Sequence, residues 1–314
     1  MNEQIQNILN SSATKTAKIQ QLLNLGLTRR QVADLVTNGN YGFVQNVYAR
    51  MMRETLQAAG RQATTVVPEL DYTFTRNFGV EIEAYNCDRN TVARELRAAG
   101  INVAVEGYNH TDHQDHWKLV TDSSLSGNQT FELVSPILHG EEGINELEKV
   151  CWVLDLCDAK VNDSCGLHIH MDAHDFEIQT WRNLAITYKR LEGVIDAFMP
   201  LSRRHNRFCK GLSGISEAAI NRARNISELR RVFNGDRYHK VNLEAFARHS
   251  TVEFRQHGGT TNFTKMSAWI HFLEKMITFA EHGMVQPHTR LENIPFLDET
   301  EKLYFRIRTR KLAA

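Results

Sequence analysis

Three short runs of this sequence alternate apolar residues with ionisable ones, and no other feature constrains the fold as strongly. The runs are GVEIE at 79–83, GLHIH at 166–170 and VEFR at 252–255. Positions i and i+2 of a β-strand point to the same side of a sheet. Each run therefore predicts a strand with one apolar face and one face that carries two ionisable groups. The three pairs are Glu81 with Glu83, His168 with His170, and Glu253 with Arg255.

An antiparallel sheet with one solvated face also alternates in this way, and that explanation is sufficient for a single pair. It is less satisfactory for three pairs built from Glu, His and Arg, because exposed strands favour Thr, Lys and Ser. Glycine precedes two of the pairs, and Gly258-Gly259 follows the third, which indicates close approach of the backbone to a ligand. A fourth run, FELVSP at 131–136, places Glu132 on a mixed face with Val134. We expect these residues to share one polar face.

The same periodicity analysis predicts how strands and helices follow one another beyond residue 77. Strands are expected at 78–84, 101–105, 117–121, 131–135, within 160–172, at 241–246 and at 251–256. Helices are expected at 91–99, 142–158, 178–199, 216–233 and 265–282, the last being the final long helix. Adjacent pairs of strands separated by helices predict an α+β domain, 77–314, with a largely antiparallel sheet.

The first 56 residues predict a separate module of three short helices. Thr28 is a suitable N-cap for the second helix, and 57–76, which contains Pro68, predicts a linker. Residues 1–65 carry seven Lys/Arg and three Asp/Glu, a charge of +4, whereas the rest of the chain carries −4. The module resembles a helix-turn-helix, so DNA contact through Gln45, Asn46 and Arg50 on the third helix is one hypothesis. A docking module without DNA contact is the other.

Several classes of protein are disfavoured by the composition. No apolar run approaches the about 18–20 residues that cross a bilayer, and the start Met-Asn-Glu-Gln-Ile lacks the features of a secretory signal. A cytoplasmic protein without membrane contact is therefore expected. The five cysteines are odd in number and include no C-x-x-C pair, which argues against a disulfide framework or a four-cysteine zinc site.

Glutamates and a histidine that converge on one sheet face favour a divalent cation. Oxygen ligands suit Mg²⁺ or Mn²⁺, which commonly bridge carboxylates and nucleotide phosphates, and Arg255 is placed to hold an anion. Residues 203–240 contain ten Lys/Arg against three acids, an excess of +7 that makes phosphate binding a competitor to an ordinary solvated surface. No P-loop or G-x-G-x-x-G motif follows a strand, which excludes the common nucleotide folds.

Six motifs in order, FGVEIE, WKLVTDSSL, FELVSPIL, CGLHIHMD, LSRRHNRFC and TVEFRQHGGT, resemble the amidoligase family over about residues 76–282. That family belongs to the glutamine synthetase and γ-glutamylcysteine ligase-like superfamily. The resemblance implies a curved antiparallel sheet that holds Mg²⁺ ions against the phosphates of ATP. It also implies an ATP-dependent carboxylate–amine ligase that acts through an acyl phosphate on small-molecule or peptide substrates.

The resemblance also implies roles for individual residues. The implied metal ligands are Glu81, Glu83, Glu132, Glu253 and one of His168 and His170. Arg255 would hold the transferring phosphate, and Asp122 would be a further ligand or would hold the amine. Arg203, Arg207 and Lys210 would face the nucleotide or an acidic substrate. The oligomeric state is not predicted.

Two alternatives remain open from the residues themselves. The run HIHMDAH at 168–174 approaches the H-x-H-x-D-H of zinc hydrolases, although its last spacing is one residue too long. The other alternative is a DNA-binding regulator that senses a ligand through the same polar face without turnover.

Overall fold

The computed structural model describes residues 3–58, 74–107 and 115–313. The chain divides into two compact units, Met1–Glu69 and Leu70–Ala314. Most of the linker predicted at 57–76 lies outside the described residues, and its first two residues belong to a helix. Each unit is described by itself below.

In its described residues, the first unit has four helices around a small apolar core. They are α1 (Glu3–Asn10), α2 (Lys15–Asn24), α3 (Arg29–Val36) and α4 (Tyr41–Ala58). Thr28 caps α3 by accepting a hydrogen bond from the amide of Gln31, and the side-chain oxygen of Gln31 accepts one from the Thr28 amide. This capping box fixes where α3 begins. The buried core is formed by Ile19, Leu22, Val32, Ala33, Val44 and Val47.

Helix α1 adds one helix to the three that the sequence predicts. It is eight residues long, little more than two turns, and contains only three apolar residues, Ile5, Ile8 and Leu9. A pattern this short is weak as a helical signal. These three side chains pack partly buried against the core of the unit, which explains why the helix forms there.

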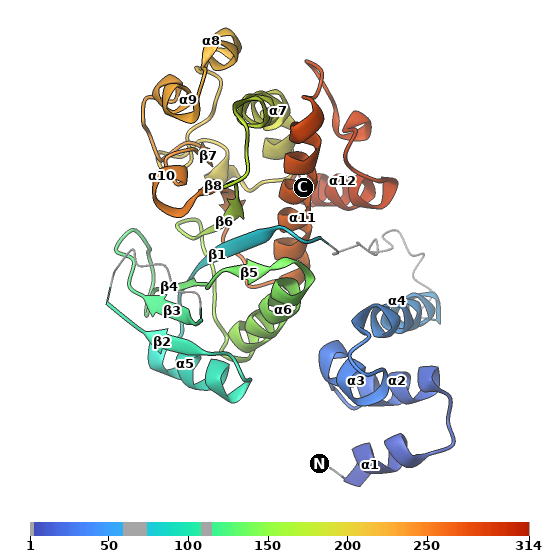
Figure 1. The fold of residues 1–314 in the computed structure, drawn as a ribbon. Coiled ribbons are helices and arrows are strands. Elements are labelled where there is room, and N and C mark those ends of the chain that lie inside the picture. The colour runs from blue at the N-terminus through green and yellow to red at the C-terminus, as the bar shows by residue number, and fades with distance from the viewer. Residues whose placement is uncertain (1–2, 59–73, 108–114, 314) are drawn as a thin grey trace. The chain divides into compact units, whose positions relative to one another are not determined.

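Among its described residues, the second unit contains one sheet of eight strands. Figure 1 shows how they are arranged. The strands are β1 (Asn77–Ala84), β2 (Val103–Val105), β3 (Trp117–Val120), β4 (Phe131–Val134), β5 (Leu138–His139), β6 (Gly166–Asp172), β7 (Val241–Asn242) and β8 (Thr251–Gly258). Their order is β2-β3-β4-β1-β6-β8-β7, with β5 pairing to the start of β1. Among the described strands only β2 and β3 pair in parallel. This arrangement of helices and a mostly antiparallel sheet confirms the α+β class predicted from the sequence.

Helices cover the apolar face of this sheet. The helices of the unit are α5 (Arg89–Ala98), α6 (Gly140–Leu156), α7 (Ile178–Ala197), α8 (Glu217–Arg222), α9 (Ile226–Val232), α10 (Phe246–His249), α11 (Phe263–His282) and α12 (Glu299–Ala313), with 3₁₀ turns η1 (Leu201–Arg203) and η2 (Leu291–Asn293). Figure 1 shows α6, α7 and α11 gathered on one side of the strands. Val80, Ile82 and Leu167, which alternate with the ionisable residues, belong to the core between the sheet and these helices. The ionisable residues are consequently left on the opposite face.

Two sequence-predicted elements differ from the structure because polar side chains interrupt them. The helix predicted at 216–233 is divided into α8 and α9, since Ala223 leaves helical geometry and Asn225 caps a new helix through the amide of Glu228. The strand predicted at 241–246 ends at Asn242. There the Asn242 side chain accepts the amide hydrogen of Glu244 at 2.8 Å, and this turn leads into α10.

The helix α11 is not the last long helix of the chain, contrary to the prediction, because α12 follows it. Helix α12 is rich in charged residues and buries little more than Glu301 and Phe305, so its apolar pattern is weak. Glu301 is held by Lys275 of α11 at 2.7 Å. In the described part of the chain, none of the helices has the length and apolarity that crossing a bilayer requires.

Candidate active site

The strand register places the predicted ionisable pairs in adjacent rows on the polar face. Glu83 of β1 lies opposite Glu132 of β4, and Glu81 lies opposite His168 of β6. One row further, His170 lies opposite Glu253 of β8. Because neighbouring strands lie about 4.8 Å apart, this register alone brings together side chains from four separate stretches of sequence.

A bulge between β6 and β8 sets the positions of the two ionisable residues on β8. Leu167 pairs with His257, but Ile169 pairs with Phe254, so β8 carries one extra residue at this point. The side chain of Gln256 points to the helix-covered face, where it accepts a hydrogen bond from Tyr188 of α7. Such bulges redirect side chains locally. Here the bulge leaves Glu253 and Arg255 together on the polar face.

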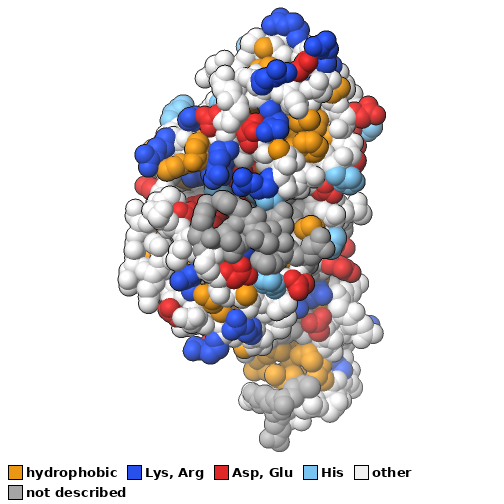
Figure 2. Space-filling model, turned by 60° about the vertical axis from the view of Figure 1, so that its left-hand side comes forward, with side chains coloured by type: hydrophobic (Ala, Val, Ile, Leu, Met, Phe, Trp, Pro, Cys, Tyr) orange, Lys and Arg blue, Asp and Glu red, His pale blue; other side chains and the backbone are white. Residues whose placement is uncertain are grey.

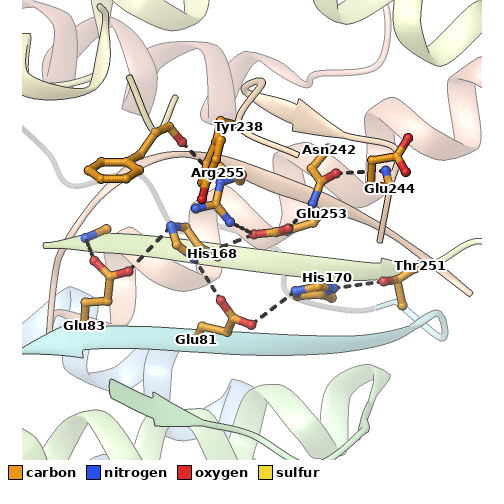
Figure 3. Close-up of polar contacts among 12 residues, drawn as sticks. Glu81, Glu83, His168, His170, Tyr238, Asn242, Glu244, Thr251, Glu253 and Arg255 are labelled. Atoms are coloured by element: carbon orange, nitrogen blue, oxygen red, sulfur yellow. Dashed lines mark hydrogen bonds and ion pairs between the residues drawn. The ribbon is translucent and has the colours of Figure 1, made fainter. Parts of the chain in front are cut away.

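His168 is the centre of the contacts on this face (Figure 3). Its Nδ1 lies 2.9 Å from Glu81 Oε2 and 3.7 Å from Glu253 Oε1, and its Nε2 lies 3.8 Å from Glu83 Oε1. Arg255 forms an ion pair with Glu253. His168, Glu83 and Glu253 are each about 5% exposed. The imidazole therefore connects two groups of carboxylates within a largely buried site.

Two sets of three side chains are close enough to hold a cation, and both contain His168. One set is Glu81, His168 and Glu253, and the other is Glu83, Glu132 and His168. In each set the potential ligand atoms all lie within 4.8 Å of one another. His170 belongs to neither set: its Nε2 lies 3.4 Å from Glu81, and its Nδ1 lies 2.9 Å from the Thr251 hydroxyl. Of the two histidines, His168 is thus the better placed to be a ligand.

The carboxylates of the site differ in their electrostatic surroundings. Burial raises the pKa of Glu81, but hydrogen bonds from His168 and His170 outweigh it and hold that pKa well below its usual value. Burial also raises the pKa of Glu253, but the charges of Arg255, His170 and His168 together outweigh it, so that this pKa is lowered. Glu132 has no such compensation. Burial and the nearby charges of Glu81, Glu83 and Asp122 raise its pKa well above the usual value.

The polar face is the floor of a cavity of about 900 Å³. Most of the predicted site residues line it: Glu81, Glu83, Asp122, Glu132, His168, His170, Arg203, Glu253 and Arg255. The segment from α9 to α10 forms a wall of the cavity that carries Arg230, Arg237, Tyr238 and Arg248. Figure 2 shows a face of the molecule on which Lys and Arg side chains gather beside acidic ones. A cavity with acids on its floor and arginines on one wall suits a cation together with a phosphorylated ligand.

The three basic residues predicted beside Arg255 for nucleotide binding are placed differently from one another. The buried Arg203 lines the cavity, but its guanidinium donates to the backbone carbonyl of Arg255. Arg207 and Lys210 are exposed and are not among the described residues that line the cavity. Lys210 is paired with Asp236 at 2.6 Å. The arginines of the wall, Arg237 and Arg248, are closer to the expected role.

Sequence reasoning missed two buried polar residues of the site. Lys118 of β3 is 7% exposed and lines the cavity, and Asn242 of β7 donates its amide to Glu253. A lysine within the apolar strand run WKLV was a usable signal, since Lys118 shares a face with Val120 and stands opposite Val134. Asn242 gave no comparable signal, because its strand contains only two residues.

Three of the glycines beside the ionisable runs lie where a side chain would collide with other atoms of the protein. A Cβ on Gly166 would lie 2.9 Å from His168 Nε2 and 3.0 Å from Arg203, and its amide donates to Glu83. Gly258 and Gly259 instead face Pro200 and Cys165 of the chain itself. The close approach predicted from these glycines is therefore to protein atoms at 166, 258 and 259.

The run HIHMDAH does not bring its three histidines together. His174 is exposed and bonds to Asp172 at 2.8 Å, and it is not among the described residues that line the cavity. His168 and His170 share the polar face, but each is held by Glu81. Neither of the two sets of described residues that could hold a cation contains both His168 and His170, as a zinc site of the H-x-H-x-D-H type requires.

Comparison with known protein families identifies a matching family. A family model described as "Putative amidoligase enzyme" matches residues 74–277, which is more than half of the chain. The match includes every strand of the sheet and every residue of the site described above. A comparison with curated proteins finds none that matches.

Proposed function

The chain belongs to the amidoligase family, and on this premise we propose that it joins a carboxylate to an amine with the hydrolysis of ATP. Family membership supports a ligase-type enzyme. The dependence on ATP and the acyl-phosphate route are our proposal. The observation that supports it is the pair of acidic triads around His168, set in a cavity that several arginines also line.

The residues present fit divalent cations such as Mg²⁺ or Mn²⁺. Four carboxylates and one imidazole converge within two overlapping triads, and the raised pKa of Glu132 reports unneutralised negative charge at this position. Hard oxygen donors of this kind are the ligands that these ions prefer. We assign Glu81, Glu83, Glu132, His168 and Glu253 as the residues that would hold them. Bound there, the cations would neutralise the charge of nucleotide phosphates.

Arg255 is assigned to the transferring phosphate. Its guanidinium is oriented by Glu253 and by the carbonyl of Phe208, at 3.2 Å from the arginine Nε. The fork geometry of an arginine matches a phosphoryl group and favours the charge that develops during transfer. Arg237 and Arg248 of the wall are suited to the remaining phosphates, and Tyr238 to contact with the base.

The proposed reaction has two steps. The substrate carboxylate attacks the γ-phosphorus of ATP, so that an acyl phosphate forms and ADP leaves. The amine nitrogen then attacks the acyl carbon, phosphate leaves, and the nitrogen loses a proton. Asp122 lines the cavity beside Glu132 and is suited to hold the incoming ammonium group. The contribution of the protein is mainly positioning and neutralisation of charge.

Nucleotide binding can be tested before either substrate is known. We expect Mg²⁺ with a non-hydrolysable ATP analogue to raise the thermal midpoint of the full chain. A ligand at about 100 times its Kd adds about 2.7 kcal/mol, equivalent to about 5 °C for a unit of this size. The shift should vanish in Glu83→Gln and persist in Glu141→Gln, which alters an exposed glutamate of α6. A shift with Zn²⁺ but none with the nucleotide would refute the ligase.

Catalysis is tested by the release of ADP and phosphate from Mg²⁺–ATP. Release should require both a carboxylate and an amine from a substrate panel, and it should be lost in Glu253→Gln. Release that needs neither substrate would identify an ATPase instead of a ligase.

A further inference from the structure

A second, smaller hollow adjoins the cavity described above. Its volume is about 190 Å³, and it shares with the larger cavity the residues Glu81, Lys118, Val134, His170 and His249. The two spaces therefore meet along the edge of the polar face that carries Glu81. Neither the arginines of the wall nor Asp122 line the smaller hollow.

The hollow follows from the strand register. Val134 of β4 stands between Glu81 on one side and Lys118 of β3 on the other, and its side chain is shorter than either. In the next row, Gly79 lies opposite His170 and has no side chain to fill the space. The side chains on the polar face are consequently shorter at this point than around His168, and the hollow lies above them.

The floor of the hollow is apolar, and its polar lining combines Lys118 with histidines and with the carboxylates of Glu81 and Asp172. Val134, Pro136 and Ile137 contribute apolar surface, and Ile137 is 44% exposed although it adjoins a site. Lys118 is the single Lys or Arg among the described residues that line the hollow. It is buried, so its charge acts in a medium of low dielectric, where attraction to an anion is stronger than in water.

This inference rests on the proposed function and concerns the substrate that is activated. We propose that the hollow binds a compact carboxylic acid, with its short apolar chain on Val134, Pro136 and Ile137 and its carboxylate between Lys118 and the glutamate cluster. The size of the space selects against longer acids, since sites for drug-sized ligands occupy about 300–1,000 Å³. The carboxylate then lies at the junction with the larger cavity, where the nucleotide phosphates are proposed to bind.

The test uses butyrate, L-alanine and L-glutamate as probes, with butylamine as the match of opposite charge. Each is titrated against the thermal midpoint of the full chain with Mg²⁺ present. At least one carboxylate should raise the midpoint, and butylamine should not. In Lys118→Met the apparent affinity for that carboxylate should fall about tenfold or more, as expected for losing a charged hydrogen bond. Lys149→Met, at an exposed lysine of α6, should bind as the unaltered protein does.

Gly79→Ala provides a second variant that preserves the fold. The added methyl group would lie 3.6 Å from Ser135 Oγ and 3.7 Å from His170 Cβ, which are ordinary contacts. It should weaken carboxylate binding by partly filling the hollow, and leave the shift caused by Mg²⁺ with the ATP analogue unchanged.

The outcomes separate this inference from the proposed function. A nucleotide shift without any response to the three carboxylates, or equal binding by Lys118→Met, overturns the substrate site and leaves the ligase standing. A carboxylate response that depends on Lys118 without any nucleotide shift supports the substrate site and refutes the ligase. Equal responses to butyrate and butylamine overturn the role of Lys118.

Discussion

At the scale of single residues, the position that suits Glu132 to its proposed role as a metal ligand also lowers the stability of the fold. Burial and the charges of Glu81, Glu83 and Asp122 raise its pKa well above the usual value. The folded protein thus binds this proton more tightly than the unfolded chain does. The stability that this proton contributes is present below the unfolded pKa and is lost as the pH rises through the folded pKa. At neutral pH, where the unfolded chain has lost this proton, Glu132 therefore lowers the stability of the cation-free fold.

We expect Glu132→Gln to stabilise the cation-free protein at pH 7 by about 0.5–2 kcal/mol, the range typical of changes that relieve a functional site. The gain should shrink towards pH 4, where the native glutamate is itself protonated. Urea unfolding at both pH values, without metal, measures this difference. Mg²⁺ should also stabilise this variant less than it stabilises the unaltered protein. If Glu132→Gln were less stable at pH 7 than the control variant Glu141→Gln, the inferred repulsion between Glu132 and its acidic neighbours would be wrong.

Asn242 of β7 orients Glu253, one of the proposed metal ligands. Its side-chain amide donates to Glu253, and its oxygen accepts the amide hydrogen of Glu244. Asn242→Asp keeps the shape but replaces the donor with a second carboxylate beside Glu253. The free energy of unfolding at pH 7 should fall by about 1–3 kcal/mol, the cost of an unsatisfied buried group. Asn293→Asp, at an exposed residue of η2, should change it little. Equal stability in both variants would show that Asn242 does not hold Glu253.

The residues that could be predicted share one property, a local alternation that shows in the sequence. Glu81, Glu83, His168 and Glu253 each belong to a run whose own period places them on the polar face. Lys118 and Asn242 lie outside these runs, on the short strands β3 and β7. Their roles depend on which strands become neighbours, and that is decided by contacts between distant parts of the chain.

At the scale of elements, a buried lysine joins the segment before β7 to helix α7. Lys240 is fully buried, and its Nζ lies 2.6 Å from Asp196 and 2.8 Å from Glu192. Its backbone carbonyl accepts the amide hydrogen of Arg255. Behind the bulge of β8, the side chain of Gln256 donates to the same Asp196. This network therefore fixes the strand that presents Arg255 to the cavity.

Lys240→Met leaves two partly buried carboxylates without their cation. The expected loss is about 2–3 kcal/mol of unfolding free energy, below the range for a fully buried pair because Glu192 and Asp196 keep some contact with water. Lys210→Met is a matched control, since Lys210 forms an exposed ion pair of similar length with Asp236 and should cost at most about 1 kcal/mol. Equal losses in urea unfolding would show that the network contributes no more than a surface pair.

The elements themselves were more predictable than their pairing. The long helices α6, α7 and α11 and the strands β1, β6 and β8 follow the periodicities read from the sequence. The position of the bulge does not, because Leu167 and Ile169 change register only in relation to β8, more than eighty residues away. Polar side chains that cap or turn the chain, such as Asn225 and Asn242, account for the elements whose extents were misjudged.

At the scale of the whole molecule, the two units differ in charge. Residues 1–65 carry seven Lys/Arg against three acids, whereas the remainder carries 30 against 34. On helix α4 of the first unit, Asn46 and Arg50 are exposed. Gln45, also predicted to contact DNA, accepts a hydrogen bond from Arg29, whose guanidinium lies 5.2 Å from the centre of the Tyr48 ring. Gln45 is therefore engaged within the unit, and Asn46 and Arg50 are the better candidates for an external partner.

We propose that this first unit contacts duplex DNA through α4, and the salt dependence of binding tests it. Each phosphate contact releases counterions, so removing one should reduce the slope of log K against log salt by about 0.9. Arg50→Gln in the full chain should show this reduction. Arg94→Gln, at an exposed arginine of the second unit, should keep the original slope. Binding that is lost equally in both variants would arise from the charge of the whole protein. Binding that neither variant alters would place the contact elsewhere, and α4 would then serve as a docking helix.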